Sequence, residues 1–131
     1  MKHLVSDVGE LKKHVKESQL GYRQAIIDYY KCLGESQGYT ASVNAAVVRY
    51  LWDYGSVDLA WIEPNTTFNL EFGVLEDVYK HLIKNLVLDP EYVVLVLNSK
   101  AKCLPEKVLE LVSKTPCFKR LSEKIVLVDV A

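Results

Sequence analysis

The chain has 131 residues, of which 50% are hydrophobic and 25% are charged, and its formal net charge is −1. This composition is typical of a globular protein, predicts a single domain over residues 1–131, and excludes an intrinsically disordered chain. The pI of about 6.3 argues against a strongly basic nucleic-acid-binding surface, while a local basic patch stays compatible with it.

The three cysteines, Cys32, Cys103 and Cys117, are odd in number and far apart. This spacing fits neither a disulfide framework nor a zinc site, and it favours free thiols in a reducing compartment. No apolar run approaches the roughly 20 residues that cross a bilayer, and the N-terminus lacks the apolar centre of a signal peptide. We therefore expect a soluble, cytoplasmic protein with no membrane partner.

The N-terminal third is predicted to be helical. Asp7, with Glu10 three residues later, has the pattern of a capping box, and apolar residues follow at helical spacing. Gly34 and Gly38 are expected to mark the end of the helical stretch. The pattern predicts one long helix over residues 7–34, or two helices with a break near Gly21.

Three strands are predicted next. Residues 39–51 are rich in β-branched and small side chains, and residues 56–62 and 68–72 alternate apolar and polar positions. The segment Glu63-Pro64-Asn65-Thr66 between the last two has turn chemistry. These strands are expected to form an antiparallel meander.

The C-terminal half is predicted to alternate helices and strands. Residues 75–88 and 105–113 have helical periodicity, and Asp89-Pro90 stops the first of these helices. The apolar runs 92–97 and 125–130 are typical of strands covered on both faces, as in parallel sheets. The predicted fold class is α/β: a mixed sheet with an α-β-β-β-α-β core plus a C-terminal helix and strand.

Two carboxylates, Asp58 and Glu71, are embedded in the second and third strands. If Glu63 to Thr66 form the loop, Asp58 pairs directly with Glu71, on one face of the sheet. A register slip of two residues leaves them diagonal on that face, and a slip of one separates them. Alternatively, both acids are structural: Asp58 caps a turn, and Glu71 is a solvated residue on the outer face of the sheet.

Two adjacent acids repel each other, so a cation is expected to offset them. Mg²⁺ favours one or two carboxylates together with waters and phosphate oxygens, and it can activate a water for phosphodiester hydrolysis. The following helix offers two lysines, Lys80 and Lys84, on one of its faces.

This arrangement resembles the PD-(D/E)XK nuclease superfamily, also called restriction-endonuclease-like. Gly55-Ser56-Val57-Asp58-Leu59 is similar to its first acid motif and Leu70-Glu71-Phe72-Gly73 to its second, and the resemblance covers about residues 8–98. It implies an α-β-β-β-α-β core in which an acid on the second strand, an acid on the third and a lysine two residues later form the metal site. Asp58 and Glu71 are then the metal ligands, with Mg²⁺ or Mn²⁺ as cofactor.

The chain departs from this pattern at Gly73, where the lysine is expected, and it has no proline before Asp58. Some members take the cation from the helix after the third strand, which makes Lys80 the first candidate and Lys84 the second. Alternatively, the catalytic lysine is simply absent. Members often carry one more acid on the first helix, for which Glu17 is the candidate, on one face with Gln24 and Asp28.

The sequence thus leads to three hypotheses. The first is a homodimeric, metal-dependent DNA endonuclease in which Asp58, Glu71 and Lys80 are catalytic. The second is a catalytically inactive domain of the same fold that binds nucleic acid or protein, and the third is an unrelated α/β interaction domain. Five aromatic side chains suit either base stacking or packing in a core or subunit interface: Tyr29, Tyr30, Tyr50, Trp52 and Tyr54.

Overall fold

The computed structural model describes residues 2–131 and consists of one five-stranded sheet with helices on both faces. In chain order the elements are α1 (Lys2–Val5), α2 (Val8–Glu17), α3 (Tyr22–Ser36), β1 (Ala41–Arg49), β2 (Trp52–Trp61), β3 (Thr66–Glu71), α4 (Leu75–Leu88), β4 (Tyr92–Leu97), α5 (Pro105–Lys114), the 3₁₀ helix η1 (Pro116–Leu121) and β5 (Ile125–Asp129). No helix of the described residues is both long and apolar enough to span a bilayer.

The sheet is mixed, as predicted, and its strands lie side by side in sequence order, β1-β2-β3-β4-β5. The pairs β1/β2 and β2/β3 are antiparallel, whereas β3/β4 and β4/β5 are parallel. The parallel pairs are joined through α4 and through α5, as crossover connections require. The α/β class, the antiparallel meander and the crossover units are therefore confirmed.

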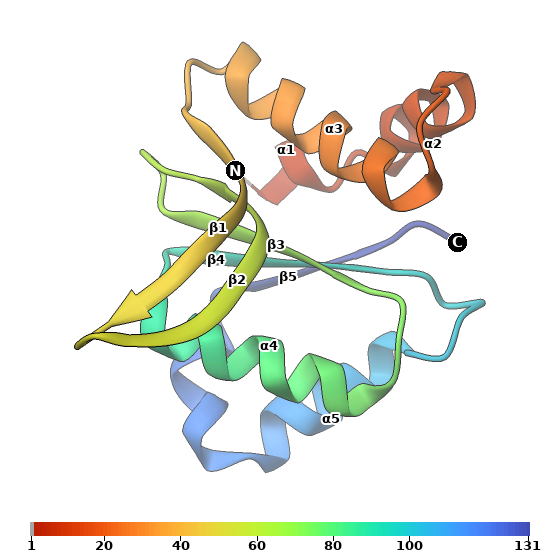
Figure 1. Cartoon of the computed structure of the whole chain (residues 1–131). Helices are drawn as coiled ribbons and strands as arrows, with labels where there is room; N and C mark the ends of the chain where they lie inside the picture. Colours follow the sequence, from red (N-terminus) through yellow and green to blue (C-terminus); the bar gives the residue numbers. More distant parts are fainter. Residues whose placement is uncertain (1) are drawn as a thin grey trace.

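Two apolar clusters hold the layers together. The first joins α2 and α3 to one face of the sheet and includes Ile26, Tyr30, Phe68 and Val94. The second joins α4, α5 and η1 to the other face. Figure 1 shows the three N-terminal helices on one side of the sheet and α4 and α5 on the other. The side chains of β4 alternate between the clusters, which explains its continuous apolar run.

The helical stretch at the N-terminus is broken between Glu17 and Tyr22, close to the predicted position at Gly21. The prediction that Gly34 ends it was wrong, because α3 continues to Ser36. A Cβ atom at Gly34 would lie 2.2 Å from the indole nitrogen of Trp61, so this glycine allows a close approach between α3 and β2. Gly38, the other glycine predicted at the helix end, follows it at φ +86°.

The β1/β2 hairpin differs most from prediction. Residues 39–51 were expected to form one strand, but β1 ends at Arg49 and β2 already begins at Trp52. The turn at Tyr50-Leu51 contains no turn-forming residue, so nothing in the sequence marked it. The strand predicted over residues 56–62 begins at Trp52, four residues earlier than predicted. The other predicted elements are present within two residues at each end, and residues 75–88 and 92–97 have the predicted bounds.

Candidate functional site

The register of the β2/β3 hairpin decides where the two acids lie. Leu59 pairs with Phe68 and Trp61 with Thr66, so the predicted pairing of Asp58 with Glu71 was wrong by two residues. The reason is the turn, which closes from Ile62 to Asn65 rather than from Glu63 to Thr66. The pairing ends at Leu59 and Phe68, so Asp58 and Glu71 both lie beyond the paired residues of this hairpin.

Asp58 lies where β2 and β3 separate, one residue before their first paired residues, Leu59 and Phe68. Its Oδ2 accepts the backbone N–H of Leu70 at 2.8 Å, and its Oδ1 pairs with the guanidinium of Arg23 from α3. The Asp58 side chain is only 16% exposed. Its carboxylate therefore bridges the two strands and lies against the residue that precedes Glu71.

Glu71 is the last residue of β3, and its side chain is 1% exposed. Its Oε1 lies 2.5 Å from Nδ1 of His81, which projects from α4. Burial and, to a lesser extent, the Glu71 charge raise the pKa of the buried Cys103 thiol. Buried acids need a partner, and His81 is the partner of this one.

A polar strip continues from Glu71 along the face of β3 that packs on α4. Thr67 donates from its hydroxyl to Asn85 at 2.5 Å, and the Asn85 amide donates to the carbonyl of His81 at 2.8 Å. Asn69 lies between Thr67 and Glu71 along β3 and is 1% exposed. Within residues 2–131, its Nδ2 is the one buried side-chain nitrogen or oxygen without a hydrogen-bond partner.

The two candidate lysines are placed differently. Lys84 donates to the carbonyl of Ser56 at 3.2 Å, which brings its ammonium alongside β2, two residues from Asp58. Lys80 is 64% exposed and lies 3.8 Å from Glu76, one turn earlier on α4. Of the two, Lys84 is the cation that contacts the strand carrying Asp58.

Glu17 is the last residue of α2 and is exposed. The prediction that it shares one helix face with Gln24 and Asp28 was wrong, because those two residues belong to α3. Asp28 is engaged by His14, at 3.1 Å.

The lysine position of the motif is shaped by a neighbour on α4. A Cβ atom at Gly73 would lie 2.6 Å from Oδ2 of Asp77, so a side chain there requires Asp77 to move. Since φ of Gly73 is not positive, the backbone itself accepts other residues.

The donor set fits a hard divalent cation of the kind that keeps much of its water. Mg²⁺ is bound through one or two carboxylates plus waters and phosphate oxygens. Asp58 and Glu71 are two carboxylates on neighbouring strands, the first held by Arg23 of α3 and the second by His81 of α4. The unpaired amide of Asn69, on β3, is a further group able to bind a water. No cluster of three or more His, Cys, Asp or Glu side chains suited to a metal occurs in the part of the chain that the structure describes.

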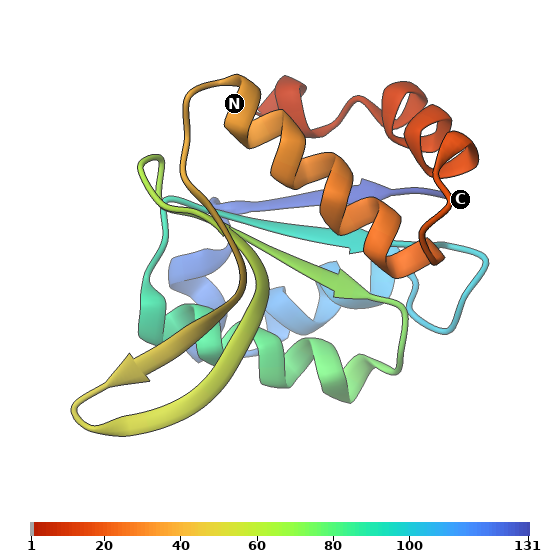
Figure 2. The same ribbon diagram turned by 45° about the horizontal axis from the view of Figure 1, so that its top comes forward.

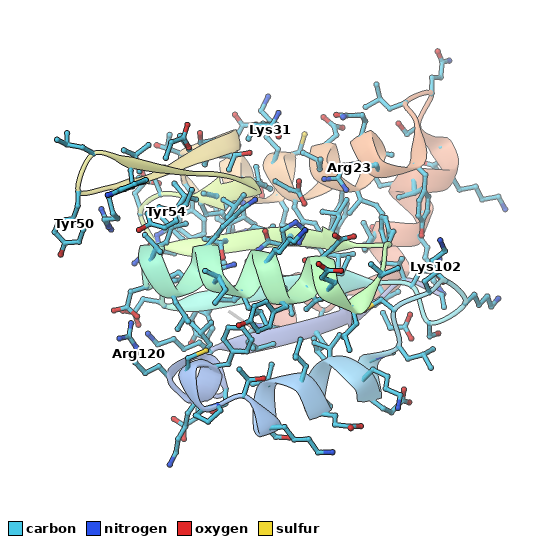
Figure 3. The ribbon with its side chains drawn as sticks, turned by 60° about the horizontal axis from the view of Figure 1, so that its bottom comes forward. Arg23, Lys31, Tyr50, Tyr54, Lys102 and Arg120 are labelled. Carbon is cyan, nitrogen blue, oxygen red and sulfur yellow. The ribbon has the colours of Figure 1, made fainter. Side chains whose placement is uncertain are left out.

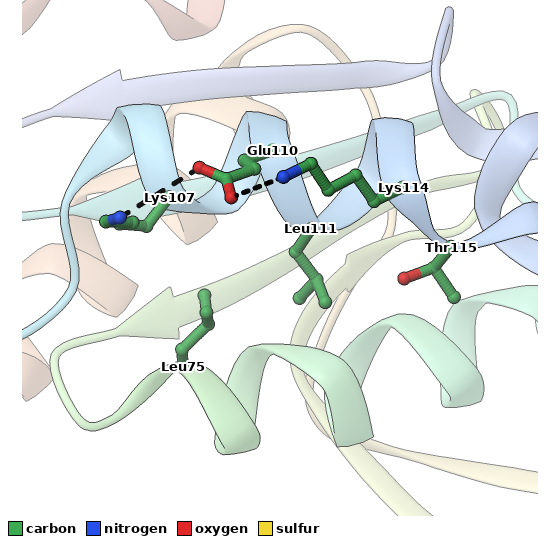
Figure 4. A pocket seen from close by; sticks show the side chains of 6 residues that line it. All are labelled: Leu75, Lys107, Glu110, Leu111, Lys114 and Thr115. Carbon is green, nitrogen blue, oxygen red and sulfur yellow. Dashed lines mark hydrogen bonds and ion pairs between the residues drawn. The ribbon is translucent and has the colours of Figure 1, made fainter.

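A separate hollow of about 290 Å³ lies between α4 and α5. Figure 4 shows that Glu110 pairs there with Lys107 and Lys114, at 3.9 and 2.9 Å. Its charged groups thus satisfy one another, and the hollow contains none of the predicted site residues.

The sequence located both acids but not their partners Arg23 and His81. Arg23 is 35 residues from Asp58 along the chain, and only the packing of α3 on the sheet brings the two together. His81 was not identified from the sequence as the partner of Glu71. Its position ten residues after Glu71, on the helix that follows the strand, was the available signal. No protein family, curated protein or solved structure matches this chain.

Proposed function

We propose that this chain is a restriction-endonuclease-like domain of the PD-(D/E)XK type that hydrolyses phosphodiester bonds in DNA with Mg²⁺ or Mn²⁺. The proposal is carried by one observation: the Asp58 carboxylate binds the N–H of Leu70, so the acid of β2 meets the strand position next to the acid of β3. The element order α3-β1-β2-β3-α4-β4 supports it, since it follows the α-β-β-β-α-β order of that superfamily.

In this proposal, Asp58 and Glu71 hold the divalent ion. When bound, the ion supplies a water of lowered pKa and stabilises charge on the phosphate. His81 is a positioning residue, because it holds the Glu71 carboxylate through Oε1. Arg23 binds Asp58 through an exposed side chain, 49% exposed, and is therefore able to swing away to a phosphate group.

Lys84 is the cation we assign to the role first considered for Lys80. Its ammonium lies beside Ser56 on the strand of Asp58, whereas that of Lys80 lies in solvent beside Glu76. A lysine near the scissile phosphate stabilises the charge that develops in the transition state. The proposed catalytic group is thus Asp58, Glu71 and Lys84.

A second candidate is a catalytically inactive domain of the same fold that binds nucleic acid or protein. Two observations favour it. Gly73 replaces the motif lysine, and both acids already have protein partners, Arg23 and His81. Under either candidate we propose a homodimer, since a chain of 131 residues has little further surface with which to grip a duplex.

The test combines metal binding with cleavage. Calorimetry with Mn²⁺ is expected to show saturable binding that is lost in Asp58→Asn and in Glu71→Gln. With supercoiled plasmid and Mg²⁺, the native protein is expected to nick DNA. Lys84→Met is expected to lower the rate by about 100-fold or more, as is typical when one transition-state donor is removed.

Lys80→Met is the matched control, because it removes an ammonium of the same helix that contacts only Glu76. It is expected to leave the nicking rate within about twofold. Metal binding without nicking, under varied DNA substrates, would favour the inactive candidate. Absence of metal binding in the native protein, with DNA present, would refute a metal-dependent site.

A further inference from the structure

The tip of the β1/β2 hairpin presents large apolar side chains to solvent. Tyr50 is 92% exposed, Leu51 102% and Trp52 71%. Figure 2 shows this hairpin curving away from the sheet, with its tip clear of the other elements. A single exposed apolar residue needs no explanation, but three in succession at a protruding tip do.

The backbone at the tip is unfavourable for these residues. Tyr50 and Leu51 form the two-residue turn and have φ values of +52° and +69°. A two-residue hairpin turn with both φ values positive strongly favours Asn-Gly, and bulky side chains are strained there. Neither packing nor turn chemistry therefore accounts for Tyr50 and Leu51, and strain that the fold does not need is a pointer to function.

The base of the hairpin, by contrast, is fixed to the body of the protein. Val47 is fully buried, and the Nε of Arg49 donates to the carbonyl of Val87 at the end of α4, at 3.4 Å. Gly55, at φ +96°, marks a shift in the register of β1 and β2, and the ammonium of Lys84 lies against it. The tip is consequently held in a fixed direction, which reduces the entropy lost when a ligand binds it.

The same segment lies in line with the proposed active site. Trp52 and Asp58 are on one strand, six residues apart, which corresponds to at most about 20 Å. Figure 3 shows Tyr50 beyond one end of α4, Tyr54 beside that end, and Arg23, the partner of Asp58, farther along toward the other end. A stacked nucleic-acid strand rises about 3.4 Å per nucleotide, so roughly six nucleotides connect the tip with Asp58.

We propose that Tyr50, Trp52 and Tyr54 form a stacking surface for unpaired bases of the DNA whose backbone reaches Asp58. This inference rests on the proposed function for its choice of nucleic acid. Aromatic rings bind bases of any sequence through their faces, and Arg49 and Lys84 beside the hairpin supply charge for the phosphates. The substrate class that fits is DNA with a single-stranded or frayed segment, rather than a fully paired duplex.

The first measurement uses the fluorescence of Trp52. The chain has two tryptophans, and the other, Trp61, is fully buried. Oligothymidylate, added with a chelator so that metal binding plays no part, is expected to quench the emission saturably. A blunt duplex of matched length is expected to bind at least about fivefold more weakly. Trp52→Phe should abolish the quenching while leaving the emission of Trp61 intact.

The second measurement uses a variant that improves the fold while removing the ligand surface. The double substitution Tyr50→Asn, Leu51→Gly installs the preferred turn pair, so its thermal midpoint should equal or exceed that of the native protein. Its affinity for oligothymidylate, by fluorescence anisotropy, is expected to fall roughly 5- to 150-fold for the stacked ring lost. Leu109→Ala is the matched control, since Leu109 is 57% exposed on α5, away from the hairpin.

Unchanged affinity in the turn variant would overturn the proposal. A concentration-dependent dimer that the turn variant lacks would also overturn it, because the tip would then mediate self-association. Quenching of Trp52 by phosphatidylserine vesicles but not by DNA would overturn it as well. The two proposals fail separately. Quenching without any nicking refutes catalysis and leaves the stacking surface, whereas Asp58-dependent nicking without quenching refutes the stacking surface alone.

Discussion

The two roles of Asp58, structural and metal-binding, are separable by comparing Asp58→Asn with Asp58→Ala. In the native protein Oδ2 accepts the Leu70 N–H at 2.8 Å and Oδ1 pairs with Arg23. Asparagine keeps an oxygen for Leu70 and turns its NH₂ group toward Arg23. Alanine leaves the Leu70 N–H without its acceptor.

The magnitudes follow from these contacts. An unsatisfied, partly buried N–H costs about 1–3 kcal/mol. The pair with Arg23 contributes no more than about 1 kcal/mol, because the arginine is half exposed. Asp58→Ala is therefore expected to lower the free energy of unfolding by about 2–3 kcal/mol, and Asp58→Asn by about 1 kcal/mol or less.

Urea unfolding followed by circular dichroism measures both values, and calorimetry with Mn²⁺ measures the metal site in the same samples. Both variants are expected to lose Mn²⁺ binding, since the amide lacks the negative charge that a hard cation requires. Equal destabilisation by the two substitutions would show that the Leu70 contact is not what Asp58 provides to the fold. Mn²⁺ binding retained by Asp58→Asn would remove Asp58 from the metal site.

Three further predictions concern the packing and titration of the fold. Gly34→Ala places a methyl group 2.2 Å from Nε1 of Trp61, so it should cost about 1–3 kcal/mol in urea unfolding, whereas Ala at the open position Gly21 should cost far less. Cys103 is buried, and burial raises the pKa of its thiol, so a thiol reagent should modify it only after denaturation. Hydrogen bonds from the side chain and backbone of Thr40 lower the pKa of Glu63 below its usual value. The stability they contribute should be present above the unfolded-state pKa and lost as pH falls through the lower folded-state pKa, and Glu63→Gln should remove that part of an acid-unfolding profile.

The sequence predicts those elements whose signals are local. Residues 75–88 and 92–97 were predicted with the right bounds because Asp89-Pro90 stops a periodic helix and a continuous apolar run follows. The turn at Tyr50-Leu51 was missed since it lacks turn-forming residues. Gly34 was misassigned because a glycine required for contact with Trp61 has the same appearance in sequence as one that ends a helix.

For the site, strand alternation identified the two acids, but not their register. A shift of one residue in the position of the turn, to Ile62–Asn65, moves the register by two residues, so Asp58 is not paired with Glu71. Arg23 comes from another layer of the fold. Its contact with Asp58 arises from the packing of α3 on the sheet, which no local pattern encodes.

The position of Gly73 connects these observations to catalysis. Gly73 lies in a bend two residues after Glu71, the last residue of β3, and a lysine side chain there is long enough to bring its ammonium back to Glu71. If Lys84 has taken over this role, the motif position is redundant rather than lost. Gly73→Lys is then expected to restore much of the nicking activity that Lys84→Met removes, once Asp77 has rotated away from the new side chain.

The single substitution Gly73→Lys, in a background that retains Lys84, should change the nicking rate little. A large gain there would mean that no cation serves the native site and that the native chain is the inactive form. The double variant could also unfold at the same urea concentration as the native protein and still show no restored nicking. That result would mean that the required cation does not act beside Glu71. The three results thus distinguish a role taken over by Lys84, a native site without a cation, and a cation that acts elsewhere.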